Sequence, residues 1–183
     1  IAQNGPGITG LVTPIKTAYW NHTPLLLVTP QAANKTMGQG GFQEVEQMNL
    51  FKDMVCYQEE VRDPSRVAEV LNRVISKAIK GSAPAQLNIP RDFWTQVVDI
   101  ELPAIINFER PSGGSEAINK AAELLSNAKF PVILSGAGVI LADAIDDCKK
   151  LAEKLSAPVA CGYQHNDSFP GKHQLAVGPL GYN

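Results

Sequence analysis

A glycine-rich turn near the beginning of the chain is the first pattern whose residue types could take part in chemistry. The stretch Asn4 to Gly10 reads NGPGITG. Glycine lets the backbone approach a ligand closely, and free N–H groups at the start of a following helix favour electron-rich ligand atoms. A tight connection between a strand ending at residues 1–3 and a helix explains the same residues without a ligand. The turn alone leaves both interpretations open.

Several histidines and a second glycine pair also have types that could do chemistry. His22 could orient an anion or shuttle a proton, but a structural hydrogen bond explains a loop histidine equally simply. The spacing of His165, Asp167 and His173 lacks the i, i+4 geometry of helical metal ligands, so we expect surface polar residues and no metal site. The stretch Gly136-Ala137-Gly138 lacks the third glycine of a dinucleotide-binding motif.

The elements that must position these residues alternate between strands and helices. Residues 25–29 form an apolar run between two prolines, which indicates a strand buried on both faces. Residues 64–80 carry one apolar stripe, with Asp63 as the predicted cap and Gly81 as the predicted end. Residues 85–89 predict another strand. We therefore expect an α/β fold, a parallel sheet flanked by helices on both faces.

A change of pattern divides the chain. Periodicity is lost after about residue 95 and returns at Ser115, which is expected to cap a helix. We predict a first domain at 1–105, a linker at 106–114 and the start of a second α/β domain at 115–183. This second domain has too few strands for an α/β layer of the usual ~100 to 150 residues, so we expect an internal fragment of a longer polypeptide.

Composition narrows the class of partner. The chain has 183 residues, 44% of them hydrophobic, with a formal net charge of -2, so no basic surface for nucleic acid or an acidic membrane is indicated. No apolar run approaches the ~20 residues of a membrane span. Cys56, Cys148 and Cys161 are predicted to be reduced core thiols. These features favour a cytoplasmic protein that binds small molecules.

Longer motifs identify a family. NGPGITG at 4–10, NHTPLLLVTPQ at 21–31, GQGGFQE at 38–44 and GSAPAQLNIPRDFW at 81–94 resemble the pyrimidine-binding domain of thiamine-diphosphate enzymes of the acetohydroxyacid synthase type. NAKFPVILSGAGV at 127–139 and SAPVACGYQHNDSFPGKH at 156–173 are similar to the opening of that family's central domain. The order and the spacing of the motifs fit, and the resemblance covers essentially the whole chain.

The resemblance implies a cofactor and where this chain would meet it. Thiamine diphosphate would lie against Gly5, Pro6 and Gly7, while its activating glutamate and its magnesium site would belong to parts of the polypeptide outside these residues. Such enzymes build the site between subunits, so a homodimer or homotetramer is implied. The 183 residues alone are expected to be inactive.

Within the family, five further runs are most similar to a branch that converts sulfoacetaldehyde and phosphate to acetyl phosphate and sulfite; one of them is PQAANKTMGQGGFQEVEQM, residues 30–48. Gly10 and Cys56 depart from the acetohydroxyacid synthase pattern, where asparagine and lysine are usual. An enzyme of this branch must hold two anions near its cofactor, the sulfonate of the substrate and phosphate.

For that reaction the resemblance implies roles for four residues. Gln43 is the expected catalytic residue, since a neutral amide can donate or accept a hydrogen bond beside the substrate. Phe42, Lys35 and His22 are expected to contact substrate, Lys35 as an anion-binding cation. For Lys35 and Gln43 the alternatives are a solvated lysine and a glutamine that caps its own loop.

Two other functions stay open. An acetolactate synthase-like enzyme would decarboxylate and join 2-oxo acids with the same cofactor, giving carbon dioxide and a hydroxyketone. A non-catalytic α/β protein would only bind a nucleotide or a partner.

Overall fold

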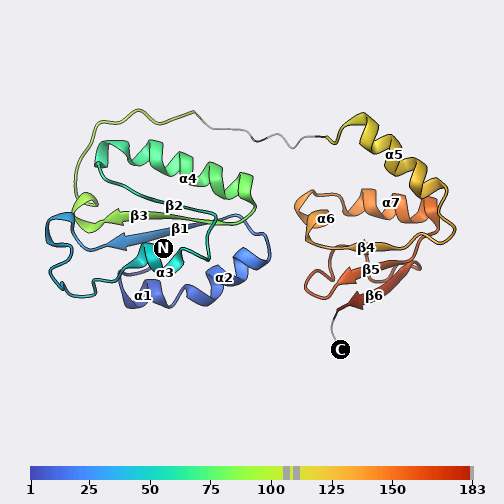
Figure 1. The fold of residues 1–183 in the computed structure, drawn as a ribbon, viewed down its shortest axis with the longest axis horizontal. Coiled ribbons are helices and arrows are strands. Elements are labelled where there is room, and N and C mark those ends of the chain that lie inside the picture. Colours follow the sequence, from blue (N-terminus) through green and yellow to red (C-terminus); the bar gives the residue numbers. More distant parts are fainter. Residues whose placement is uncertain (105–107, 109–111, 182–183) are drawn as a thin grey trace. The chain divides into compact units, whose positions relative to one another are not determined.

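The computed structural model describes residues 1–104, 108 and 112–181, and the chain divides into two compact units (Figure 1). The first unit is Ile1–Asn107 and the second is Phe108–Asn183. Each contains a three-stranded parallel sheet with helices packed on it. The predicted fold class is therefore confirmed. Most of the predicted linker, residues 106–114, lies outside the described residues, and the predicted domain bounds stay predictions.

The sheet of the first unit has the order β1-β3-β2, with β1 at Leu25–Gln31, β3 at Pro84–Pro90 and β2 at Tyr57–Glu60. The two predicted strands are confirmed, each somewhat longer than expected. The central strand β3 is buried at six of its seven positions, as a strand covered on both faces requires. The sequence analysis missed β2 because its residues, YQEE, contain no apolar run.

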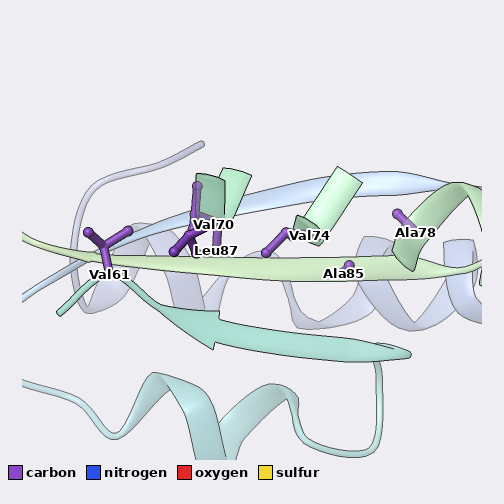
Figure 2. Close-up of a cluster of buried hydrophobic side chains, with 6 residues drawn as sticks. All are labelled: Val61, Val70, Val74, Ala78, Ala85 and Leu87. Atoms are coloured by element: carbon purple, nitrogen blue, oxygen red, sulfur yellow. The ribbon is translucent and has the colours of Figure 1, made fainter. Parts of the chain in front are cut away.

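Helix α4 (Val67–Gly81) covers one face of this sheet. Its buried residues Val70, Val74 and Ala78 pack on Ala85 and Leu87 of β3 (Figure 2). Burial of a valine or leucine side chain contributes about 1.5–3 kcal/mol, so this stripe is enough to seat the helix on the sheet.

The ends of α4 differ from the expectation in detail. Asp63 caps as predicted, because its Oδ1 accepts the Ser65 N–H at 2.9 Å, but the first turn, η2 (Pro64–Arg66), is a 3-10 helix. Gly81 is the last helical residue, and the left-handed residue that follows is Ser82, with φ 45°. Gly81 serves a different need: a Cβ there would lie 3.0 Å from Cys56 Sγ.

Three short helices cover the opposite face: α1 (Pro6–Thr9), α2 (Val12–Trp20) and α3 (Gln47–Phe51). Their side chains surround Leu27 of β1, whose neighbour Leu26 points toward α4 because successive strand residues alternate between faces. The cluster on this face consists of Ile8, Ile15, Leu27, Phe51 and Val55. The sheet therefore has helices on both faces, as expected.

The second unit also has a three-stranded parallel sheet, but its strands β4 (Ile133–Ser135), β5 (Val159–Gly162) and β6 (Ala176–Leu180) follow the chain order, β4-β5-β6. Its helices are α5 (Ser115–Ser126), α6 (Ala137–Leu141) and α7 (Ile145–Leu155). Ala152 of α7 packs with Val159, Cys161 and Phe169. The predicted cap at Ser115 is wrong: Ser115 is already helical, and Gly114 precedes the helix without a side-chain hydrogen bond.

The predicted position of the cysteines in the core is confirmed for one residue of three. Cys161 is buried and Cys148 half-buried, whereas Cys56 is exposed; all three are free thiols. Within the described ranges, no helix is both long enough and apolar enough to cross a membrane.

Candidate functional site

The glycine-rich turn forms the entry into α1. Residues 1–3 form no strand, because the Gln3 carbonyl instead accepts the N–H of Ile8 at 3.0 Å and is drawn into the helix. Pro6 opens α1, and the buried Gly5 before it has φ 70°, a left-handed value that glycine adopts without strain. The predicted turn is present, but the strand expected before it is not.

The structure brings this turn together with Gln43, which lies about forty residues further along the chain. Asn4 Nδ2 donates to the Gln43 carbonyl oxygen at 3.0 Å, and Gln3 Nε2 donates to Gln43 Oε1 at 3.2 Å. A Cβ on Gly5 would lie 2.8 Å from the Gln43 oxygen and 2.9 Å from its Cβ. Gly5 is therefore needed for contact with Gln43 as well as for its backbone conformation.

This contact limits what the turn can offer to a ligand. The side of Gly5 that lacks a side chain is covered by Gln43, and that of Gly7 by the Cβ atoms of Gln3 and Ala2, 3.2 and 3.3 Å from a built Cβ. Pro6 is exposed, Gln43 is half-buried and Phe42 is 83% exposed. These three residues contribute to the accessible surface here, together with the exposed Gln3. It can serve as one wall of a binding site, and the roles of Gly5, Pro6 and Gly7 stay predictions.

The loop that carries Gln43, residues 32–46, leaves the carboxyl end of β1 and is tied back to it near its own carboxyl end. Gln31 Nε2 donates to the Val45 carbonyl at 3.1 Å, and Gln47 Nε2 donates to the Pro30 carbonyl at 2.6 Å. Glu44 closes the glycine-rich part by accepting the N–H groups of Gly38 and Gly41 at 2.6 and 3.1 Å.

The sequence analysis missed these tethers because polar residues of a loop show no periodicity. One available signal was the position of Gln31, a polar residue at the end of an otherwise largely apolar strand.

Lys35 lies on the same loop, in the short 3-10 helix η1 (Asn34–Thr36), and is exposed. Its ammonium group makes no hydrogen bond or ion pair with the described residues, so it is free to meet an anion. Among the described residues, no hydrogen bond joins Lys35 to Gln43. Its role stays a prediction.

His22 lies apart from these residues, beyond the amino end of β1, whereas loop 32–46 follows the carboxyl end. Its φ of 53° ends α2: the His22 N–H donates to the Tyr19 carbonyl at 3.2 Å and the Thr23 N–H to the Ala18 carbonyl at 2.9 Å. This is the hydrogen-bond pattern of a Schellman helix end. His22 thus has a structural role, and the structure does not bring it together with Gln43.

A chain of buried polar side chains lies on the α1–α3 face, toward the carboxyl ends of the strands. Gln58 donates to Gln86 at 2.6 Å, Gln86 to Thr29 at 3.0 Å, Thr29 to Asn88 at 2.6 Å, and Asn88 to Glu60 at 2.6 Å. Thr29, Gln86 and Asn88 are fully buried. Each member is paired, so the chain fixes the orientation of every amide in it.

Charged residues gather instead around β2. Arg73 pairs with both oxygens of Glu59 at 2.8 Å, which lowers the pKa of Glu59. Hydrogen bonds from Arg66 and Arg73, each at 2.9 Å, lower the pKa of Glu69 to about 2. A cleft of about 510 Å³ borders this group, lined by Tyr57, Glu60 and Arg62 among others. None of the predicted site residues lines it. Among the described residues, no cluster of three or more His, Cys, Asp or Glu could hold a metal ion.

Comparison with known families defines the class of protein. Residues 1–50 match the thiamine pyrophosphate enzyme, N-terminal TPP binding domain, and residues 118–183 match the thiamine pyrophosphate enzyme, central domain. The chain therefore belongs to the thiamine pyrophosphate enzymes. A solved structure, the thiamine diphosphate-dependent 4-hydroxybenzoylformate decarboxylase of Rhodococcus jostii RHA1, agrees, with a TM-score of 0.86 and 26% identity over 98% of this chain and 35% of that one.

Curated relatives narrow the class. The chain is 77% identical to the sulfoacetaldehyde acetyltransferase of Roseovarius nubinhibens and 73% identical to the probable sulfoacetaldehyde acetyltransferase of Rhizobium meliloti, in both cases over all 183 residues. It is 32% identical to the probable acetolactate synthase large subunit of Methanocaldococcus jannaschii. The chain spans 30%, 31% and 32% of the lengths of these three relatives.

Proposed function

We propose that this chain is part of a thiamine-diphosphate-dependent acetyltransferase that converts sulfoacetaldehyde and phosphate to acetyl phosphate and sulfite, a step of taurine and sulfonate degradation. The observation that carries the proposal is the difference in sequence identity between two groups of relatives. Five relatives named for this activity share 49–77% of the residues across the whole chain, whereas the acetolactate synthases share 30–32%. The whole activity belongs to the complete protein that carries these residues.

The residues at the turn fit one wall of a thiamine diphosphate site. Pro6 and Phe42 flank the contact between Gly5 and Gln43 with exposed apolar surface. When bound, thiamine diphosphate supplies the carbon nucleophile of the reaction. In this proposal Pro6 and Phe42 exclude water, since apolar surface around reacting groups lowers the local dielectric constant.

Gln43 is the residue that we assign to the substrate. Its side-chain oxygen is already used by Gln3, so its Nε2 group remains to donate to an oxygen of the substrate. Lys35, exposed on the same loop, supplies a cation for sulfonate or phosphate. For His22 to contact substrate, the substrate or a second subunit must reach the amino end of β1.

The direct test is a product analysis of the complete protein with thiamine diphosphate, magnesium ions, phosphate and sulfoacetaldehyde. We expect sulfite and acetyl phosphate in equal amounts. Carbon dioxide and a hydroxyketone from a 2-oxo acid, with no sulfite from sulfoacetaldehyde, would instead establish the acetolactate synthase-like alternative that the 30–32% identities leave open.

Further parts of the proposal follow from a site shared between domains and subunits. We propose a cytoplasmic homodimer or homotetramer whose magnesium ion is held outside these residues. The 183-residue chain by itself should then release no sulfite, because it provides only one wall of the site. Turnover by the chain alone, at any rate above the reaction without protein, would contradict this arrangement.

A further inference from the structure

Five non-glycine residues of the described structure have left-handed backbone conformations: His22, Gln43, Ser82, Asp143 and Ser156. Four of them end helices. In each of these four, the N–H of the next residue donates to a carbonyl five residues before it, as from Ala83 to Ala78 at 3.2 Å and from Ala157 to Ala152 at 3.0 Å. The strain at these positions is explained by the way the helices close.

Gln43 is the member of this group that ends no helix. It is the third residue of a turn closed by a hydrogen bond from the Glu44 N–H to the Gly41 carbonyl, at 3.1 Å. A positive φ at this position normally selects glycine or asparagine, and for another residue it costs about 1–2 kcal/mol. Such a residue keeps its conformation only where its surroundings hold it there.

The surroundings that hold Gln43 come from the glycine-rich turn. Asn4 Nδ2 donates to the Gln43 carbonyl at 3.0 Å, and a Cβ at Gly5 would lie within 3 Å of Gln43. Asn4 uses only half of its amide in this way, since its Oδ1 is buried and has no hydrogen-bond partner in the part of the chain that the structure describes. A buried amide oxygen without a partner is unfavourable by about 1–3 kcal/mol. The Nδ2 donor is therefore the polar contact by which Asn4 acts within this chain.

We propose that Asn4 is a positioning residue for the reaction: its Nδ2 group holds the strained backbone of Gln43 against Gly5 and so directs the Gln43 side chain toward the substrate. This inference rests on the proposed function, because it gives Gln43 the contact with substrate. It assigns Asn4 no contact with substrate or cofactor. The requirement is for a hydrogen-bond donor at this position, not merely for a side chain of this size.

The test compares Asn4→Asp and Asn4→Ala in the complete protein. Aspartate has the shape of asparagine but lacks the donor, so both variants should lower kcat/KM for sulfoacetaldehyde about ten- to hundredfold, as misplacement of a reacting group by about 1 Å does. The fall should lie in kcat more than in KM. Asn49→Asp, which makes the same change at an exposed position of α3, should leave the kinetics unchanged.

A double-mutant cycle separates positioning from a general structural role. In a Gln43→Ala background, or Gln43→Asn if alanine abolishes turnover, Asn4→Asp should lower kcat/KM less than about threefold, because the side chain that Asn4 directs is already removed. An equal fold-loss in both backgrounds would overturn the proposal, since Asn4 would then act independently of Gln43. Wild-type activity in Asn4→Asp would also overturn it.

Hydrogen–deuterium exchange gives a readout that does not depend on activity. Backbone amides of residues 38–46 should exchange about tenfold faster in Asn4→Asp than in the wild type, and at the wild-type rate in Asn49→Asp. If the wild-type protein releases no sulfite, the proposed function fails on its own. Exchange then decides this inference: faster exchange in Asn4→Asp supports the contact, and unchanged exchange overturns it.

Discussion

The two faces of the first sheet differ in the polarity of their buried side chains. Toward α4, the centre of the contact between sheet and helix is apolar, with Val70, Val74 and Leu87 nearly or fully buried (Figure 2), and the ion pair of Arg73 with Glu59 lies at its rim. Toward α1–α3, the face is apolar around Leu27 but becomes polar toward the carboxyl ends of the strands, at Thr29 and Asn88. The apolar face forms because apolar residues recur at a regular spacing in α4 and β3. The polar face forms only if each hydrogen-bond donor is placed beside an acceptor.

The polar end of one face also lies beside the loop that carries the candidate site residue Gln43. The polar end of the α1–α3 face adjoins loop 32–46, which Gln31 and Gln47 tie to β1 and which carries Gln43. Ligands of open parallel sheets bind beyond the carboxyl ends of the strands. In this unit the hydrogen-bonded half of the sheet therefore supports the loop at the edge where open parallel sheets bind ligands, and the apolar face supports the fold. Substitutions on each face make this comparison testable.

The largest effect is expected on the apolar face. Leu87→Ala should lower the free energy of unfolding by about 2–5 kcal/mol, because it removes a buried side chain and leaves a cavity under α4. Urea denaturation followed through the fluorescence of Trp20 and Trp94 measures the change. The control is Leu102→Ala, at a residue that is 77% exposed. Equal effects of the two substitutions would contradict the packing described for α4.

Asn88→Leu should lower the free energy of unfolding by about 2–3 kcal/mol, somewhat less than the core truncation. It keeps the side chain large but deprives Thr29 of its acceptor and the Glu60 carboxylate of its donor. Asn49→Leu is the matched exposed control. A stabilised Asn88→Leu protein would mean that apolar packing can replace the polar chain, and that the two faces are interchangeable.

Thr29→Val removes the two hydrogen bonds that the Thr29 hydroxyl makes with Gln86 and Asn88, and should lower the free energy of unfolding by about 1–2 kcal/mol, because valine has the shape of threonine without the hydroxyl. Thr13→Val, at an exposed residue of α2, is the control. Combined with Asn88→Leu, the loss should be smaller than the sum of the single losses, since both remove the same hydrogen bond. Strict additivity in urea denaturation would show that the chain is not a unit.

The smallest effect concerns the charged rim of the apolar face and depends on pH. Hydrogen bonds from Arg73 lower the pKa of Glu59, and those from Arg66 and Arg73 lower the pKa of Glu69 to about 2. The two ionised carboxylates therefore stabilise the folded protein fully at pH values above the ordinary carboxyl pKa of 4.5. This stabilisation is lost as the pH falls from 4.5 toward 2.

Arg73→Met should accordingly reduce the midpoint of thermal unfolding slightly at pH 7 and not at pH 2. Arg62→Met, at an exposed arginine nearby, should give a difference that does not change with pH. A gap between wild type and Arg73→Met that widens on acidification would contradict the assigned direction of the two pKa shifts.

The sequence alone predicted those parts of the fold in which apolar residues repeat. β1, β3 and α4 followed from such patterns, and Asp63 acts as the predicted cap. β2 and Ser115 show the limit, because a charged edge strand and a polar helix start have no unique pattern.

At the site, the sequence indicated Gly5 and Gln43 separately. It also grouped His22 with Gln43, although the two lie beyond opposite ends of β1.

The class of fold, the family and the residue types available for chemistry follow from the amino-acid sequence, because periodicity and long motifs are properties of the chain order. The folded chain is needed to see that Asn4 and Gly5 lie against Gln43, that Gln31 and Gln47 tie its loop, and that Asn88 joins Thr29 to Glu60. Each of these contacts joins residues well separated along the chain. Hydrogen bonds and steric fit depend on distances of a few ångströms in space, and these arise only when the strands and helices have packed.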